Sequence, residues 1–245
     1  MEIKGIIFDY GGTLDSRGVH WSEVLWNGYQ QAGVPIDKET FRNAYVEGER
    51  ALARERIILP QDNFLTLLRK KVELEISFLP EQPDNPTRLS WIDSIATYCD
   101  YAARSCIDEA KPVLEKLHER YPMMLVSNFY GNIDEVLRDY GIRHLFKGII
   151  ESAVVGVRKP NPTLFRLGVD ALELRPDEVL VVGDSLNKDI QPSEALGCHV
   201  LWLKGKGWTE KEDLLTHPNT ITSISQVLDH IEAYLSDIRR HINTL

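Results

Sequence analysis

Short apolar runs and helical periodicities alternate along this chain and divide it into two kinds of region. The run from Ile3 to Phe8 is short, apolar and rich in β-branched residues, which predicts a buried strand. From Val113 onward helices alternate with similar runs, which predict strands at 123–126, 148–150, 179–182 and 200–203. Strands that alternate with helices are typical of a parallel α/β sheet.

Residues 18–101 carry helical periodicity instead. Apolar residues recur there at helical spacing, prolines separate the segments, and the block predicts about four helices. A further helix is expected to begin near Asp108. The helical block therefore interrupts the sheet after its first strand, and residues 236–245 are expected to form a frayed tail.

Composition narrows the possible partners. The formal charge is −9, and the longest basic stretch is 69–71, which we expect on the solvated face of a helix. These features argue against a nucleic-acid or anionic-membrane surface, and no apolar run approaches the ~18 residues that a membrane span requires. Cys99, Cys106 and Cys198 lack metal-binding spacing, so we expect buried, reduced thiols. Without a signal peptide, a cytoplasmic protein is predicted.

Polar side chains stand at the ends of successive predicted strands. Asp9 ends the first strand, Ser127 the second, and Asp184 follows a later one. Each has an ordinary structural explanation by itself, such as capping of a turn. Lys159 and Asp189 complete the set, and the carboxyl ends of parallel strands meet at one edge of a sheet. Together the five residues favour a site for a divalent metal and a phosphoryl group.

The order of these segments resembles the haloacid dehalogenase-like (HAD) superfamily, a group dominated by magnesium-dependent phosphohydrolases. The resemblance covers residues 1–15 and about 105–235, and it implies an active site between core and cap. The implied α/β fold is a Rossmann-like three-layer core, residues 1–15 and 104–245, with an inserted all-α cap, residues 16–103. The motifs that carry it are Phe8-Asp9-Tyr10-Gly11-Gly12-Thr13-Leu14, Val126-Ser127-Asn128, Arg158-Lys159-Pro160, and Gly183-Asp184-Ser185 followed by Asp189.

The resemblance also implies roles for the matched residues. Asp9 would be the nucleophile that forms an aspartyl-phosphate. Mg²⁺ would be held by Asp9, by Asp184 and by the backbone carbonyl of Gly11, which needs no side chain.

The remaining matched residues would handle the phosphoryl group. Ser127, the amides after it and Asn128 would bind that group. Lys159 would neutralise its charge, and Asp189 would orient Lys159. The expected ligand is a small phosphorylated metabolite, and the expected assembly is a monomer or homodimer.

Gly11 departs from the superfamily pattern. Most of its phosphatases carry there a second aspartate that protonates the leaving oxygen, an assistance that contributes about 10²–10⁴-fold. Tyr10 points to the other side of the strand and is a poor substitute. Asp15 lies just beyond the turn and is a candidate replacement.

Three interpretations accommodate the missing acid. The preferred one is a phosphohydrolase whose substrate has a good leaving group, so that alkyl esters are cleaved slowly. A second is a 2-haloacid dehalogenase-like or phosphonatase-like hydrolase. Dehalogenases generally lack a counterpart of Asp184, which this chain keeps. Phosphonatases need a cap lysine; the cap offers Lys38, Lys70 and Lys71, but residues 47–56 hold arginines and no lysine, which weakens that interpretation. A third is a catalytically weak protein that binds a phosphorylated ligand. Substrate identity is expected to reside in the cap, where the candidate residues are Trp21, Trp26, Arg50, Arg54 and Arg56.

Overall fold

The computed structural model describes residues 2–233, so the expected frayed tail lies outside the described residues. The core is a six-stranded sheet in the order β3-β2-β1-β4-β5-β6, and every neighbouring pair is parallel. The five predicted strands are present, and β6 is too short to leave an apolar run in the sequence. The strands are β1 (Gly5–Phe8), β2 (Met123–Ser127), β3 (Gly148–Glu151), β4 (Val179–Gly183), β5 (His199–Leu203) and β6 (Thr220–Ile221).

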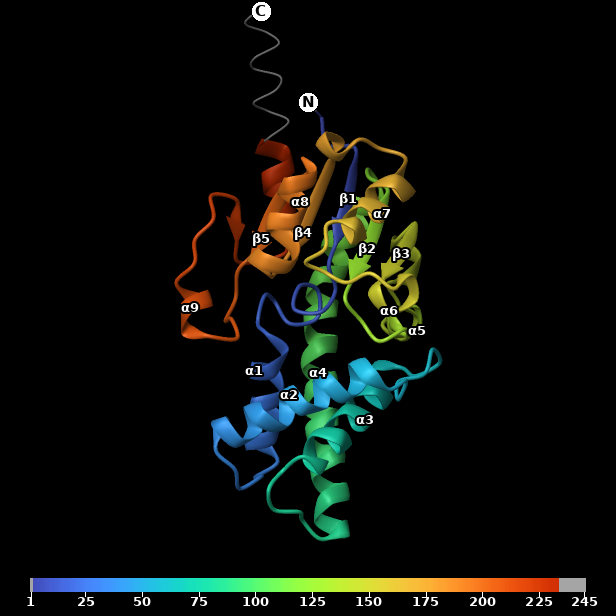
Figure 1. Ribbon diagram of the computed structural model, residues 1–245. Helices are drawn as coiled ribbons and strands as arrows, with labels where there is room; N and C mark the ends of the chain where they lie inside the picture. The colour runs from blue at the N-terminus through green and yellow to red at the C-terminus, as the bar shows by residue number, and fades with distance from the viewer. Residues whose placement is uncertain (1, 234–245) are drawn as a thin grey trace, which may run out of the picture.

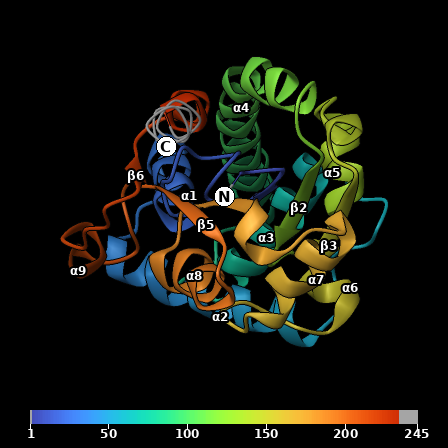
Figure 2. The ribbon, with the colours of Figure 1, turned by 90° about the horizontal axis from the view of Figure 1, so that it is seen from above.

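Helices cover both faces of this sheet, which gives the predicted three layers (Figure 2). On one face, Ile7 and Val181 pack against Phe165 of α7. On the other face, Ile6 and Phe8 belong to the cluster that includes the α4 and α5 side chains. Alternate residues of β1 therefore serve opposite layers, as the pleat of a strand requires. The helices in this part are α5 (Ile133–Asp139), α6 (Ser152–Val155), α7 (Thr163–Leu172), α8 (Gln191–Leu196) and α9 (Glu210–Asp213).

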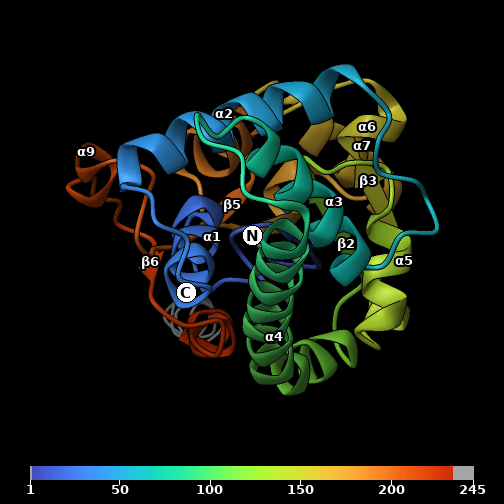
Figure 3. The same ribbon diagram turned by 90° about the horizontal axis from the view of Figure 1, so that it is seen from below.

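The all-helical insert lies beyond the carboxyl edge of the sheet (Figures 1 and 3). Three of its helices begin at a side chain that accepts a hydrogen bond from a backbone amide three residues later, at Asp37, Asn63 and Asp84. Such caps satisfy amides that lack a partner inside the helix. The insert contains α1 (Trp21–Gln31), α2 (Lys38–Arg54), α3 (Phe64–Ser77) and the first part of α4 (Asn85–His118).

Helix α4 runs through both regions. It is continuous for 34 residues, or ~51 Å at 1.5 Å per residue. The expected helix start near Asp108 is therefore wrong, because no glycine or proline interrupts residues 87–111 and Pro112 is accommodated within the helix. The expected boundary at 103/104 falls inside α4, and the division into core and cap stays a prediction. Within residues 2–233 no helix combines the length and apolarity that a membrane span requires.

Candidate active site

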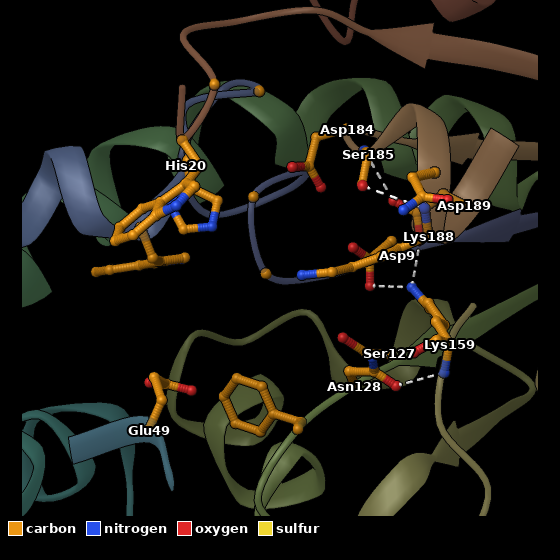
Figure 4. Close-up of a pocket in the computed structure, with 18 of the residues that line it drawn as sticks. Asp9, His20, Glu49, Ser127, Asn128, Lys159, Asp184, Ser185, Lys188 and Asp189 are labelled. Atoms are coloured by element: carbon orange, nitrogen blue, oxygen red, sulfur yellow. Dashed lines mark hydrogen bonds and ion pairs between the residues drawn. The ribbon is translucent and has the colours of Figure 1, made fainter. Parts of the chain in front are cut away.

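The sheet brings the predicted polar residues together at its carboxyl edge (Figure 4). Asp9 follows β1, Ser127 ends β2, and Asp184 follows β4. Strands β2 and β4 both pair with β1, so the three positions are neighbours in space as well as in motif order. All three line one cavity of about 560 Å³ that separates the sheet edge from the insert.

Lys159 is buried between two carboxylates. Its Nζ lies 2.7 Å from Asp9 Oδ1 and donates to Asp189 Oδ1 at 2.7 Å (Figure 4). Burial lowers the pKa of Lys159, but the carboxylates of Asp189 and Asp9 outweigh this effect and hold the pKa above its usual value. The lysine is therefore a permanent cation beside the Asp9 carboxylate.

Two further contacts fix this arrangement. Asp189 Oδ2 accepts from the Ser185 amide at 2.9 Å, which holds the carboxylate toward Lys159. Asn128 Oδ1 accepts from the Lys159 amide at 2.9 Å, and Asn128 Nδ2 donates to the Lys159 carbonyl at 3.2 Å. The Asn128 side chain thus joins the ends of two loops, and its expected role as a ligand for substrate stays a prediction.

Three carboxylates are crowded at one point of the cavity. Asp9, Asp184 and Asp189 each offer an oxygen within 4.8 Å of the others. Burial, and then the charges of Asp189 and Asp9, raise the pKa of Asp184 well above its usual value. A Cβ at Gly12 would meet the Asp184 carboxylate at 2.4 Å, so glycine makes room for it. Crowded carboxylate oxygens suit a hard divalent cation, which would relieve their repulsion, and the residues present therefore fit Mg²⁺.

The segment after Ser127 differs from the expected phosphate cradle. Ser127 is 1% exposed and lines the cavity. Two of the amides that follow it are already bonded, because the Phe129 amide donates to Ser152 Oγ at 3.2 Å and the Gly131 amide donates to Glu151 Oε1. For these two amides the expectation is wrong, because neighbouring side chains satisfy them first.

Asp15, the candidate replacement, does not occupy the place of the missing acid, and Tyr10 does not either. Gly11 lines the cavity, and a Cβ built there meets no atom within 4 Å. Tyr10 is fully buried, with its ring edge-on to that of Phe129. Asp15 accepts from the Gly12 amide at 2.8 Å and from Trp21 Nε1 at 2.9 Å, and it is not among the described residues that line the cavity. Burial raises the pKa of Asp15 to about 8, although both hydrogen bonds oppose that shift.

The helical insert forms one wall of the cavity, here called the cap wall. One residue of the basic stretch 69–71 belongs to this wall. Lys71 is 4% exposed and lines the cavity, so its expected place on a solvated face is wrong. Its spacing from Phe64, Leu67 and Leu68 is the signal that places it on the apolar face of α3. Lys38 and Lys70 pair with Glu23 and Asp62 instead. Of the five cap residues proposed for specificity, Trp21 lines the cavity, and Trp26, Arg50, Arg54 and Arg56 do not.

His20 and Glu49 also line the cavity, and the sequence interpretation did not include either residue. Burial, and then the charge of Lys188, lower the pKa of His20 to about 4, so the ring is neutral at pH 7. Its Nδ1 caps α1 by accepting from the Ser22 amide at 3.2 Å. A histidine before an amphipathic helix is too common a pattern to have indicated this position.

Comparison with known proteins gives a consistent result. The family model for haloacid dehalogenase-like hydrolases matches residues 3–197. Phosphoglycolate phosphatase of Aliivibrio fischeri is 37% identical over 93 residues, which is 37% of this chain and 40% of that protein. Glyceraldehyde 3-phosphate phosphatase of Pyrococcus furiosus is 29% identical over 94% of this chain and 93% of its own.

Most matched relatives are covered only in part. The matches span less than half the length of the first four curated relatives. Among solved structures, a HAD hydrolase of Bacillus subtilis in its magnesium-bound form has a TM-score of 0.61 at 15% identity, over 95% of this chain and 100% of that one. At this identity the likeness shows the fold.

Proposed function

This chain belongs to the haloacid dehalogenase-like hydrolases, and from that premise we propose that it is a magnesium-dependent phosphohydrolase of small phosphorylated metabolites. The observation that carries the proposal is the buried Asp9–Lys159–Asp189 arrangement beside Asp184. A nucleophile, a fixed cation and a metal-binding carboxylate are the groups that phosphoryl transfer needs. Relatives named as phosphoglycolate and glyceraldehyde 3-phosphate phosphatases support the reaction class.

In the first step an Asp9 carboxylate oxygen attacks phosphorus, and the bond from phosphorus to the leaving oxygen breaks. In the second step water attacks the aspartyl-phosphate, which releases inorganic phosphate and restores the Asp9 carboxylate. Lys159 neutralises charge on the phosphoryl oxygens, and Asp189 holds Lys159 in place. Ser127 binds a phosphoryl oxygen from the end of β2.

Mg²⁺ would be held by the Asp9 and Asp184 carboxylates and by the Gly11 carbonyl. When bound, it supplies positive charge next to the transferring group. The cytoplasm is the proposed location, because the three buried cysteines are free thiols.

Gly11 sets the expected substrate preference. With no acid at this position, the leaving oxygen departs as an anion and takes its proton from solvent. Substrates whose leaving groups are weakly basic, such as acyl phosphates or phosphoanhydrides, then react faster than alkyl esters.

The test is phosphate release from acetyl phosphate, p-nitrophenyl phosphate and a sugar phosphate, with magnesium or with chelator. Release that requires both magnesium and Asp9, with Asp9→Asn as the control, is expected. Chelator-resistant cleavage of a 2-haloacid would instead favour a dehalogenase. Because Lys71 lines the cavity, phosphonoacetaldehyde belongs in the same panel, and preferential cleavage of it would favour the phosphonatase-like reaction.

A further inference from the structure

One polar cluster interrupts the apolar cap wall of the cavity. Its member Glu49 lies on the side away from Asp9 (Figure 4). Glu49 of α2 and Lys71 of α3 meet Tyr130, which belongs to the core loop after β2. Tyr130 Oη donates to Glu49 Oε1 at 2.9 Å, and Lys71 Nζ bonds to the same oxygen. The surrounding wall is aromatic or aliphatic, with Trp21, Tyr45, Phe64, Leu67 and Leu68.

The positive charge of Lys71 is balanced inside the cluster. Its side chain is 5% exposed, its Nζ lies 3.2 Å from Tyr130 Oη, and the Tyr45 ring centroid is 4.9 Å away. Burial lowers the pKa of Lys71, a shift that the neighbouring carboxylate of Glu75 opposes. A ligand in the cavity therefore does not meet Lys71 as a free cation.

Glu49 is the member of the cluster that a ligand meets. Its side chain is 33% exposed, against 5% for Lys71. The remaining cations of the cavity, Arg158 and Lys188, flank Lys159 and Asp189 in sequence, so they belong to the phosphoryl end. The cap end thus presents oxygen acceptors, and with the buried Glu75 beside Lys71 it holds two acidic side chains and one basic side chain.

We propose that Glu49 and Tyr130, held by Lys71, form a subsite that selects substrates with a hydroxylated remote end and rejects those with a carboxylate there. This inference rests on the proposed phosphohydrolase function and deepens it. A hydroxyl donates to the Glu49 carboxylate, whereas a carboxylate meets like charge in a cavity where little water screens the repulsion. Among alkyl esters, the favoured substrates are therefore the phosphates of small polyols or sugars.

The experiment compares kcat/KM for glycerol 1-phosphate and 3-phosphoglycerate, two three-carbon alkyl esters that differ in the remote group. The wild type should prefer glycerol 1-phosphate, and Glu49→Gln should lower that preference by about tenfold, because the amide removes the negative charge. Glu47→Gln is the matched control, since Glu47 lies on the same helix, pairs with Arg50 and does not line the cavity. A generally disrupted cap would lower both rates and leave their ratio unchanged.

Equilibrium binding separates this inference from the proposed function. Titration of both compounds into Asp9→Asn with magnesium, with and without Glu49→Gln, should show the same preference without turnover. Equal affinities, or an unaltered ratio in Glu49→Gln, would overturn the subsite. If the wild type cleaves neither p-nitrophenyl phosphate nor acetyl phosphate, the proposed phosphohydrolase function is wrong. That result leaves the subsite standing, because the binding titration tests it without turnover.

Discussion

Two buried lysines face the same cavity from opposite sides, and their surroundings set them apart. Lys159 is 5% exposed and Lys71 is 4% exposed. Lys159 has carboxylate oxygens at 2.7 Å on both sides, and its pKa is raised, whereas burial dominates at Lys71 and lowers the pKa. At Lys159 two close, buried carboxylates thus outweigh desolvation, whereas at Lys71 desolvation prevails.

The difference assigns separate tasks to the two walls of the cavity. The wall formed by the sheet edge, here called the core wall, keeps a permanent cation next to Asp9, the proposed nucleophile. This arrangement suits a reaction step that is the same for every phosphorylated substrate. The cap wall keeps its charges paired and exposes Glu49, which suits discrimination between substrates. If both proposals hold, we expect that substitutions can change the rate of phosphoryl transfer and the substrate selectivity independently.

The largest effect is expected from the loss of Lys159 in the core wall. Lys159→Met removes the partner of Asp9 and Asp189, so phosphate release should fall by about 10³-fold, the scale of a lost charge-stabilising donor. Two carboxylates left buried without a cation should also cost about 3–5 kcal/mol of unfolding free energy. Steady-state kinetics at saturating magnesium and urea denaturation measure the two effects.

The same substitution of lysine by methionine at Lys71, in the cap wall, should have a much smaller effect on the rate. Lys71→Met should reduce acetyl phosphate hydrolysis by less than about tenfold, or 1.4 kcal/mol of barrier, because Lys71 does not touch Asp9. Equal losses in both variants would contradict the division of tasks. Lys147→Met, at an exposed site, controls for the loss of a surface lysine.

At Asp15, which bonds to Gly12 of the core turn and to Trp21 of the cap, we expect an effect on the pH dependence of stability. Its folded pKa of about 8 lies above the unfolded value, so the folded state binds more protons between these values. The stability from this group is complete below pH ~4 and is lost as pH rises through about 8, a change on the order of a few kcal/mol. Urea denaturation at several pH values should show that Asp15→Asn lacks this component, and parallel pH profiles for the two proteins would exclude it.

The sequence located the core wall better than the cap wall, for a physical reason. Asp9, Ser127 and Asp184 stand at ends of parallel strands, and parallel strands must present those ends at one edge. The contact of Glu49 with Lys71 and Tyr130 depends on how two helices and a loop pack, which local spacing does not specify. The spacing of α3 did place Lys71 on the apolar face, but the basic neighbours Arg69 and Lys70 hid that signal.

Local sequence patterns also did not predict that α4 is continuous or that amides after Ser127 are already hydrogen-bonded. Helix boundaries without glycine or proline leave no local mark, so a start near Asp108 could not be distinguished from a helix interior. The amide partners, Ser152 and Glu151, are 23 and 20 residues away in sequence. Only the folded chain reveals that they take these hydrogen bonds.

The central claim is phosphoryl transfer at Asp9 without a positioned acid, and the dependence of rate on leaving-group basicity tests it most directly. The measurement is kcat/KM for a series of aryl and alkyl phosphates, for the wild type and for Gly11→Asp, whose side chain has open space. The wild-type rate should fall steeply as the leaving group becomes more basic, and Gly11→Asp should raise alkyl-ester turnover by about 10- to 10³-fold and flatten the dependence. A shallow wild-type dependence, unchanged in Gly11→Asp with magnesium bound, would contradict the account.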